Sequence, residues 1–457
     1  MPAAHSSPEL EARKFRPYPK YKDSGIEWLG QIPAHWDIYP LRRRLFKKAA
    51  SIKIGPFGSQ LKLEFMSNDG FKVYGQEHVI ARDFRRGNKY INKAKFDELS
   101  ACEIRPNDLM VTMMGSSGHS AVVPGGIEPG IMDSHLLRVR LTDCALDIRY
   151  VALLINDSSY IRDQIVTEGK GAIMQGLNSS IIKSLILAVP PPTEQHIILT
   201  FLDRDIAKID ALIAKKERLI ELLQEKRTAL ITQAVTKGLD PHVPMKDSGI
   251  EWLGKIPRRW KVTALKRVAS IKYGLGEPPQ LLADGIPFVR ATNVTKGRII
   301  PNEMQFVDPK DVPWHRNPVL RSGDIIVVRS GAYTGDSAII PTKYEGAIAG
   351  YDMVMRPQQG TSSRFLAWAL LSQYILEGQI ELQSLRAAQP HLNAEELGAI
   401  LVFCPPEYEQ THIASFLDRE TAKIDDMLIK IHEAIERLKE YRTALISAAV
   451  TGKIDLR

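Results

Sequence analysis

Cysteine is scarce in this chain of 457 residues, where only Cys102, Cys144 and Cys404 occur, far apart from one another. An odd number of scattered cysteines gives neither a disulfide framework nor the spacing of a thiolate metal site. The first residues include charged side chains such as Glu9 and Glu11 and form no apolar signal segment. No apolar run approaches the roughly 18 residues that a membrane span requires. We therefore expect a cytoplasmic protein with reduced thiols.

Catalytic signatures are also missing. Proline pairs occur within 190–192, 278–279 and 405–406, but none belongs to the Asn/Asp-Pro-Pro-Tyr/Phe motif that holds the target adenine in methyltransferases. The chain has no glycine-rich cofactor loop and no Gly-Lys-Ser/Thr phosphate loop, and its histidines form no His-x-x-x-His pair. We expect no catalytic, metal or cofactor site in this chain, so any chemistry must belong to other chains.

The net charge of +8 is concentrated in one region. Between Arg42 and Lys95 there are fourteen Lys and Arg residues against four acidic ones, whereas the rest of the chain is slightly acidic. A basic region of this kind indicates a polyanionic partner, most simply nucleic acid. A solvated basic face without a partner is the alternative that charge alone leaves open.

The chain contains two copies of one long helix pattern. Apolar residues recur in steps of four and three from Glu194 to Thr236, the spacing of a coiled-coil seam, and adding 215 to each number gives the same pattern again. The pattern predicts long helices over 193–237 and 407–453. The predicted seam residues are Leu202, Ile206, Ile209, Ile213, Ile220, Leu223, Leu230, Leu417, Ile424, Leu428, Ile431, Ile435, Leu438 and Leu445.

A second repeat precedes each half of the chain. Residues 22–30 and 246–254 are identical, and each segment is followed by an Ile-Pro pair and a tryptophan, Trp36 or Trp260. The chain is therefore a tandem duplication. We divide it into an N-terminal tail (1–21), a first domain with its lead-in (22–192), a first long helix (193–237), a linker with a second domain (238–406), a second long helix (407–453) and a C-terminal tail (454–457).

Each half contains one globular region, which we call the first body (residues 37–190) and the second body (residues 261–404). Short β patterns broken by Gly and Pro, with helical patterns at Ile148 to Ile165 and at Arg364 to Leu382, predict an α+β fold for both. Matching islands, such as the buried strands that lead to Gly115 and Gly331, indicate common ancestry. Periodicity does not determine the strand order.

The short linker after the first long helix constrains the architecture. The second helix can bury its apolar stripe against the first only by running back antiparallel, because parallel packing needs a long connection. We expect two α+β domains joined by two antiparallel coiled-coil helices and related by a pseudo-twofold axis. The basic seam residues Lys216, Arg227 and Arg442 fit a role in fixing register or, as we favour, snorkelling at the edge of the helix pair.

The two long helices also agree at polar positions off the seam, which packing alone does not require. We interpret these positions as docking surfaces for two identical partner subunits, since repeated surfaces accept the same protein twice. Recent duplication with little drift is the alternative. The predicted docking residues are Glu194, Gln195, Asp203, Arg204, Glu409, Gln410, Asp418 and Arg419.

From Lys22 to about Lys453 the chain resembles the specificity subunit of type I restriction-modification systems. The resemblance is carried by the doubled lead-ins, the Pro-rich junctions before Glu194-Gln195 and Glu409-Gln410, the Phe201-Leu-Asp-Arg204 segment and the Arg227-Thr-Ala-Leu-Ile231 segment with its copy. It implies a non-catalytic subunit whose two target-recognition domains each read one half of an interrupted DNA sequence. The implied partners are double-stranded DNA, two methyltransferase subunits that use S-adenosylmethionine, and restriction subunits that use ATP with Mg.

Because the two bodies differ, the two half-sites should differ as well. Arg and Lys can bind phosphates or guanine edges, and Gln76 and Asn293 can pair with adenine. The candidate DNA-binding residues are Gln76, Arg82, Arg85, Arg86 and Lys89 in the first body, and Arg290, Asn293, Lys296, Arg298, Arg329 and Tyr333 in the second. A helical scaffold that assembles proteins without reading DNA is the alternative function, and a self-contained nuclease or methyltransferase lacks the necessary motifs.

Overall fold

The computed structural model describes residues 15–45, 51–115, 118–141, 145–169, 177–250, 254–381 and 391–457. The chain divides into two compact units. Unit 1 comprises Met1–Ala214 with Ala434–Arg457, and unit 2 comprises Lys215–Glu433. Each unit therefore holds one body together with one part of each long helix. Cys144 and Trp252 lie outside the described residues.

Both predicted long helices are present. Helix α6 runs over Pro192–Lys237 and α11 over Glu407–Val450. Proline suits the start of α6 because the first turn has no N–H partner to lose. Gly238, with φ of 77°, follows the last residue of α6 in the left-handed conformation that closes many helices.

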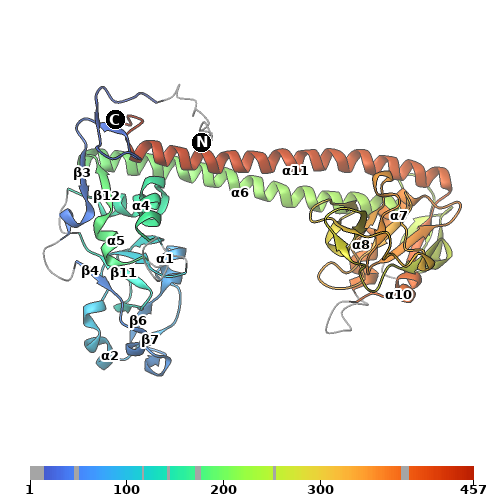
Figure 1. Ribbon diagram of the computed structural model, residues 1–457, viewed down its shortest axis with the longest axis horizontal. Helices are drawn as coiled ribbons and strands as arrows, with labels where there is room; N and C mark the ends of the chain where they lie inside the picture. Colours follow the sequence, from blue (N-terminus) through green and yellow to red (C-terminus); the bar gives the residue numbers. More distant parts are fainter. Residues whose placement is uncertain are drawn as a thin grey trace. The chain divides into compact units, whose positions relative to one another are not determined.

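The long helices run antiparallel within each unit, as expected. In unit 1 the first turns of α6 share a core with the last turns of α11, as Ile198 and Ala449 illustrate (Figure 1). In unit 2 the last turns of α6 share a core with the first turns of α11, as Ala234 and Ile413 illustrate. All the predicted seam residues are buried or half-buried, and none is exposed.

Two of the three basic seam residues, Arg227 and Arg442, form ion pairs between the helices rather than snorkelling at an edge, so our preferred interpretation of these two was wrong. In unit 2, Nε of Arg227 lies 3.7 Å from Oδ1 of Asp425, and in unit 1, Nε of Arg442 lies 3.4 Å from Oδ1 of Asp210. Only 17% of the Arg227 side chain is exposed, and burial lowers the pKa of its guanidinium. These two equivalent pairs join fixed positions of the two helices, which supports a role in register.

The first body is α+β. Its strands form an antiparallel sheet in the order β4-β11-β8-β9, a second sheet in the order β10-β6-β7-β5 with β10 and β6 parallel, and the two-stranded pairs β1-β2 and β12-β3. The strands are β1 Tyr21–Asp23, β2 Gln31–Pro33, β3 Asp37–Pro40, β4 Ile52–Ile54, β5 Met66–Ser67, β6 Phe71–Tyr74, β7 Tyr90–Ile91, β8 Leu109–Thr112, β9 Ser120–Val122, β10 Gly130–Met132, β11 Leu136–Val139 and β12 Ile186–Val189. The α-helices are α1 Gln76–Ala81, α2 Lys93–Glu98, α3 Ile148–Asp157, α4 Ser159–Gly169 and α5 Ser179–Ser184.

The second body repeats this strand order. Its sheets are β16-β25-β22-β23, β17-β21-β18-β24 with β18 and β24 parallel, and the pairs β13-β14, β15-β26 and β19-β20. The strands are β13 Met245–Asp247, β14 Lys255–Pro257, β15 Lys261–Ala264, β16 Ala269–Tyr273, β17 Leu281–Leu282, β18 Ile286–Val289, β19 Val294–Thr295, β20 Arg298–Ile299, β21 Gln305–Val307, β22 Ile325–Val327, β23 Ser337–Ile339, β24 Ile348–Ala349, β25 Met353–Pro357 and β26 Leu401–Cys404. The helices are α7 Ser363–Leu370, α8 Gln373–Ile375, a π-helix η9 Leu376–Glu381, and α10 Ala394–Ala399.

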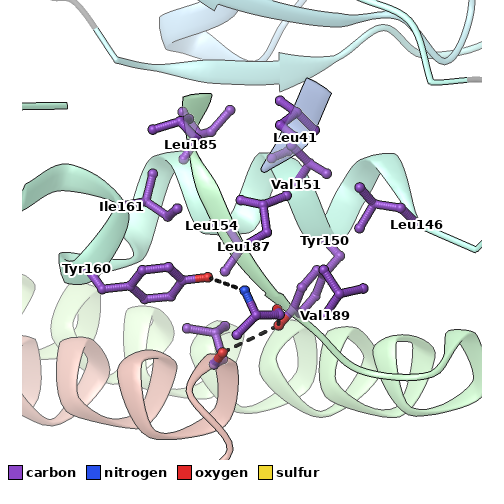
Figure 2. Packing of buried hydrophobic residues seen from close by; sticks show 14 of the residues in the cluster. Leu41, Leu146, Tyr150, Val151, Leu154, Tyr160, Ile161, Leu185, Leu187 and Val189 are labelled. Atoms are coloured by element: carbon purple, nitrogen blue, oxygen red, sulfur yellow. Dashed lines mark hydrogen bonds between the residues drawn. The ribbon is translucent and has the colours of Figure 1, made fainter. Parts of the chain in front are cut away.

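Two buried tyrosines form hydrogen bonds with β12, and one of them also reaches the end of α11 (Figure 2). The Tyr160 hydroxyl accepts a hydrogen bond from the Ala188 amide at 3.3 Å, and the Tyr150 hydroxyl donates to the Ala188 carbonyl at 3.2 Å. The carbonyl of Val450, the last residue of α11, lies 3.5 Å from the same Tyr150 hydroxyl. Burial raises the pKa of Tyr150, which keeps this hydroxyl protonated as a donor.

Residues 1–21 lack periodicity, which predicts a loose tail, but the described part of this tail is folded against the rest of unit 1. Of the N-terminal tail, residues 15–21 are described: Tyr18 is 3% exposed within the core of unit 1, and Tyr21 begins β1. In the C-terminal tail, the Asp455 amide donates to the Arg16 carbonyl at 2.7 Å. The error arose because these segments lack periodicity but gain their structure from contacts with each other and with the core.

Candidate nucleic-acid interface

The turn after β6 in the first body and the turn after β18 in the second body have the same construction. In the first body the Gly75 amide donates to Nδ1 of His78 at 3.0 Å, and in the second the Arg290 amide donates to Oδ1 of Asn293 at 3.2 Å. Asn293 is 0% exposed, and its Nδ2 donates to backbone carbonyls. It therefore holds the turn and has no free amide for a base, which corrects our assignment of Asn293 as a DNA-reading residue.

The basic cluster of the first body separates into two places. Arg85, Arg86 and Lys89 are exposed beside β6 and β7, which lie at the end of this body far from α6 (Figure 1). The fully buried Lys72 supports this end, because its Nζ donates to the Arg85 carbonyl at 3.1 Å. Arg82 instead lines a pocket with residues of α3 and α6. Gln76 is half-exposed at the first position of α1.

The basic residues of the second body separate in the same way. Arg298 forms an ion pair with Asp425 of α11, and Lys296 lines a pocket with Glu221 and Glu225 of α6. Both cations therefore lie along the long helices of unit 2. Arg290 and Arg329 lie elsewhere, on the loops that follow β18 and β22.

Arg329 is held between aromatic side chains. Its Cζ lies 4.5 Å from the ring centroid of Tyr273 and 4.2 Å from that of Tyr351, while its Nη2 lies 3.3 Å from Nε2 of His391. We call Tyr273, Arg329, Tyr351 and His391 the arginine cluster. The two tyrosines are only about half buried, and Tyr333, farther along the same loop as Arg329, is exposed. The cluster thus presents a cation and several ring faces to the surroundings, which are the groups that bind phosphates, guanine edges and base faces.

The backbone around Arg329 is fixed from two sides. Its amide donates to Oδ1 of Asp352 at 3.2 Å, and its carbonyl accepts from the Leu392 amide at 2.7 Å. Asp352 is buried, and burial raises the pKa of its carboxyl group. Gly274, next to Tyr273, approaches so closely that a Cβ would lie 1.9 Å from the Gly350 carbonyl oxygen. Tyr273, the last residue of β16, and Tyr351, between β24 and β25, are therefore held next to each other by backbone in close contact.

A pocket of about 260 Å³ adjoins the arginine cluster. Phe288, Arg290 and Tyr351 are among its lining residues. Nε of Arg290 is buried without a hydrogen-bond partner, although its Nη2 donates to the Glu303 carbonyl at 3.1 Å. The pocket combines an apolar ring with a cation, which suits a flat, polar-edged group such as a base.

The first body carries other side chains at the equivalent place. Its position equivalent to Arg329 is Met113, whose carbonyl accepts from the Leu177 amide as that of Arg329 accepts from the Leu392 amide. Exposed apolar residues follow the two strands that pair with β11, with Phe57 and Leu63 after β4 and Met114, next to Met113, after β8. One framework therefore presents a cationic, aromatic surface in the second body and an apolar one here.

Sequence reasoning found Arg329 and Tyr333 but missed Tyr273, Tyr351 and His391. These three come from separate segments of the chain and share no local pattern. The only signal was their setting, because Tyr273 and Tyr351 each adjoin a glycine at a strand end.

Three of the eight predicted docking positions are buried inside the chain. Gln195 is 0% exposed, and its side chain binds the Asp147 amide and the Ala145 and Pro190 carbonyls, each at 2.8 Å. Gln410, 3% exposed, binds the Ser362 amide at 2.8 Å in the same way. Glu194 is likewise buried. The docking assignment of these three residues was wrong, because all three are buried and the two glutamines make equivalent internal hydrogen bonds in their own units.

The remaining docking positions lie nearer the surface. Asp203 and Asp418 form ion pairs with Arg149 and Arg364, which join each body to its long helix. Arg204 and Arg419 are exposed and pair with the acidic residue that follows each of them. Glu409 is half-buried. These positions can contribute to a surface, although the two aspartates also have a structural role.

Within the described ranges, no group of three or more His, Cys, Asp and Glu residues is placed to hold a metal ion. In the same part of the chain, no helix is both long and apolar enough to cross a bilayer.

Each unit thus carries one α+β body on its part of the two antiparallel long helices. A sequence model of the family described as Type I restriction modification DNA specificity domain matches residues 257–437. These residues include the second body, with its arginine cluster, and the first part of α11.

Relatives in other organisms match most of the chain. It is 24% identical over 373 residues to the type I restriction enzyme MjaVIII specificity subunit of Methanocaldococcus jannaschii, covering 80% of this chain and 83% of that one. It is 22% identical over 360 residues to the EcoBI specificity subunit of Escherichia coli, covering 77% and 74%.

Solved structures share the fold. A chain from a structure described as the basis of complex assembly and conformational transition of the type I R-M system has a TM-score of 0.71 at 15% identity, over 92% of this chain and 98% of that one. The HsdS subunit from Thermoanaerobacter tengcongensis has a TM-score of 0.53 at 14% identity, over 93% and 98%. The chain is thus similar over most of its length to specificity subunits of type I restriction enzymes, and its residues 257–437 match the DNA specificity domain of type I restriction modification.

Proposed function

We propose that the two bodies read the two unequal halves of an interrupted sequence in double-stranded DNA, and that the paired long helices set the gap between the halves. The observation that carries this proposal is the contrast at one equivalent place, where the second body has Arg329 among aromatic rings and the first has Met113. Two bodies that share a backbone framework but carry different side chains at this place are suited to read different base sequences.

In the second body, base reading is assigned to Arg290, Arg329 and Tyr333, with Tyr273 and Tyr351 as stacking surfaces. Arg is suited to this role because its guanidinium binds guanine O6 and N7 with two hydrogen bonds. Lys296 and Arg298, beside the long helices, are assigned to phosphates, where a cation contributes affinity that falls with salt.

In the first body, Gln76, Arg85, Arg86 and Lys89 are assigned to DNA at the end away from α6. Gln76 is suited to pair with an adenine, whereas the three cations are suited to phosphates or guanines. Arg82, beside α6, is assigned to a phosphate.

The same proposal gives the chain its partners. Two methyltransferase subunits that use S-adenosylmethionine dock on the equivalent outer faces of the long helices, near the exposed Leu212 in unit 1 and the exposed Met427 in unit 2. Restriction subunits that use ATP and Mg complete the assembly, which acts on cytoplasmic DNA.

Mapping methylated adenines in a host genome tests the proposal directly. The chain is co-expressed with its cognate methyltransferase, with the methyltransferase alone as the control. We expect one bipartite, asymmetric motif that appears only when both chains are present. The absence of any motif, with the complex formed, would refute DNA reading and favour a protein scaffold.

A further inference from the structure

The ends of β4 and β8 in the first body have the same backbone framework as the arginine cluster of the second. Strand β11 pairs with both β4 and β8, as β25 pairs with both β16 and β22. The Gly55 amide donates to the Leu136 carbonyl at 2.9 Å, and the Gly274 amide donates at 2.9 Å to the carbonyl of the residue just before β25. Ile54, which precedes Gly55, therefore takes the place of Tyr273.

The other two members of the framework can be matched in the same way. Met113 takes the place of Arg329, and its amide donates to the His135 carbonyl at 2.9 Å. His135 and Tyr351 each come directly before the residue whose carbonyl accepts the glycine amide, so His135 takes the place of Tyr351. The first body thus has Ile, Met and His where the second body has Tyr, Arg and Tyr.

The side chains at this place in the first body are apolar and open to solvent. Ile54 is 38% exposed, and the neighbouring Phe57 and Met114 are 82% and 43% exposed. Ile54 and Met113 emerge at one edge of the sheet, because the backbone beside each of them bonds to residues at the start of β11. We call Ile54, Phe57, Met113 and Met114 the apolar cluster. Apolar side chains left exposed together are typical of a binding surface.

The charge around the apolar cluster indicates which partner it meets. Ile54 and Phe57 belong to the segment 42–95, where fourteen Lys and Arg residues stand against four acidic ones. Asp133, the acidic residue two positions before His135, is mostly buried, and its Oδ1 accepts from the His135 amide at 2.9 Å. Basic surroundings attract phosphates, which favours DNA over an apolar protein surface. Thymine is the one unmodified base that presents a methyl group in the major groove.

We propose that the apolar cluster reads thymine, by packing against the C5-methyl groups of one or two A·T pairs in the half-site of the first body. Met113 faces a thymine methyl where Arg329 of the second body faces a guanine edge. This inference rests on the proposed function, because it requires the first body to read DNA, and it goes further by naming the base that this body selects.

Duplexes that lack only the methyl groups test the inference. The chain in complex with its cognate methyltransferase is titrated with a duplex that carries its methylation motif. A second duplex has deoxyuridine in place of each thymine in the half-site of the first body, which is the half that Arg329→Ala leaves unchanged. We expect deoxyuridine to weaken binding by about fourfold for each methyl contact that is lost.

A double variant connects this loss to the apolar cluster. Phe57→Ala with Met114→Ala removes two exposed side chains and should leave the fold intact. The variant should bind the thymine and deoxyuridine duplexes with less than about a twofold difference, because the groups that contact the methyls are gone. Val166→Ala, an exposed apolar truncation on α4, is the matched control and should keep the full difference.

The results that overturn the inference differ from those that refute the proposed function. A motif whose first-body half lacks thymine would overturn the inference alone, as would equal binding of the two duplexes by the native chain. A difference that the double variant retains would assign the methyl contacts to other residues. Loss of methyltransferase binding in the double variant would make the apolar cluster a protein surface. The absence of any motif, with the complex formed, would refute DNA reading itself.

Discussion

At the residue scale, two glutamines show how repetition in a sequence can be misread. Gln195 and Gln410 follow glutamates at the starts of α6 and α11, and both use their whole amide to bind backbone groups of their own body. From sequence their repetition suggested a shared outer partner. The structure instead shows that each glutamine binds backbone groups within its own unit. No local sequence pattern distinguishes such an internal role from a docking role.

Replacing either glutamine should destabilise its own unit. Gln195→Ala leaves the Asp147 amide and two carbonyls without partners, and we expect a loss of about 2 kcal/mol in the free energy of unfolding. Gln410→Ala should cost a similar amount in unit 2. Chemical denaturation measures both, with the exposed Thr193→Ala as the control. A change no larger than that of the control would contradict the internal role.

Because Asp352 is buried, we expect the stability of the protein to depend on pH. Burial raises the pKa of its carboxyl group above the ordinary value of 3.8. The contribution of this group to the free energy of unfolding is therefore fully present below pH 3.8, and it is lost as the pH rises through the pKa of the folded state. Asp352→Asn keeps an oxygen for the Arg329 amide and carries no charge. The variant should melt at a higher temperature than the native chain near pH 7.

The gap in melting temperature between native chain and Asp352→Asn should close as the pH falls toward about 4. Thermal melts at several pH values measure this. The exposed Asp311→Asn should show no such trend. A gap that stays constant with pH would contradict the assignment.

At the element scale, the long helices were predictable and their polar contacts were not. Periodicity indicated α6 and α11 with ends close to those observed, because a seam leaves a repeating local pattern. The pairs Arg227–Asp425 and Arg442–Asp210 join positions about 200 residues apart in sequence, and only the folded register brings them together. The arginine cluster could not be predicted from the sequence for the same reason, because its members come from four separate segments of the chain.

The more buried of the two ion pairs should contribute more to stability. Asp425→Ala leaves the guanidinium of Arg227 buried without its partner and should cost about 1–3 kcal/mol, whereas Asp210→Ala, beside the more exposed Arg442, should cost about 1 kcal/mol or less. Adding Arg227→Met to Asp425→Ala should restore much of the loss, because an apolar side chain of similar length suits the seam. Chemical denaturation measures all four proteins. A double variant as unstable as Asp425→Ala alone would contradict this explanation.

At the scale of the whole molecule, duplication explains both the likeness and the difference between the bodies. The strand order is the same in both, and the side chains at the loop ends differ. The α+β class could be predicted from the short β and helical patterns, and the division into two halves from repeated segments such as residues 22–30. It did not give the strand order, because short strands separated by turns can pair in several ways.

Lengthening both long helices should change the gap in the DNA target and nothing else. Four residues, about one helical turn, are inserted after Ala214 in α6 and after Ile429 in α11, which are equivalent positions of the repeat. The methylation motif should keep both half-sites and gain intervening base pairs, because the helices act as the spacer. Altered half-sites would contradict this role, and an insertion in α6 alone is the control for loss of pairing between the helices.

The methylome of an Arg329→Ala variant tests the central claim most directly. The variant and the native chain are each co-expressed with the methyltransferase, and Arg316→Ala, an exposed change in the same body, is the control. We expect one half of the motif to relax at one or two base pairs while the other half and the gap stay unchanged, because each body reads its own half-site. A motif that is unchanged in both halves, or altered in both, would contradict the account.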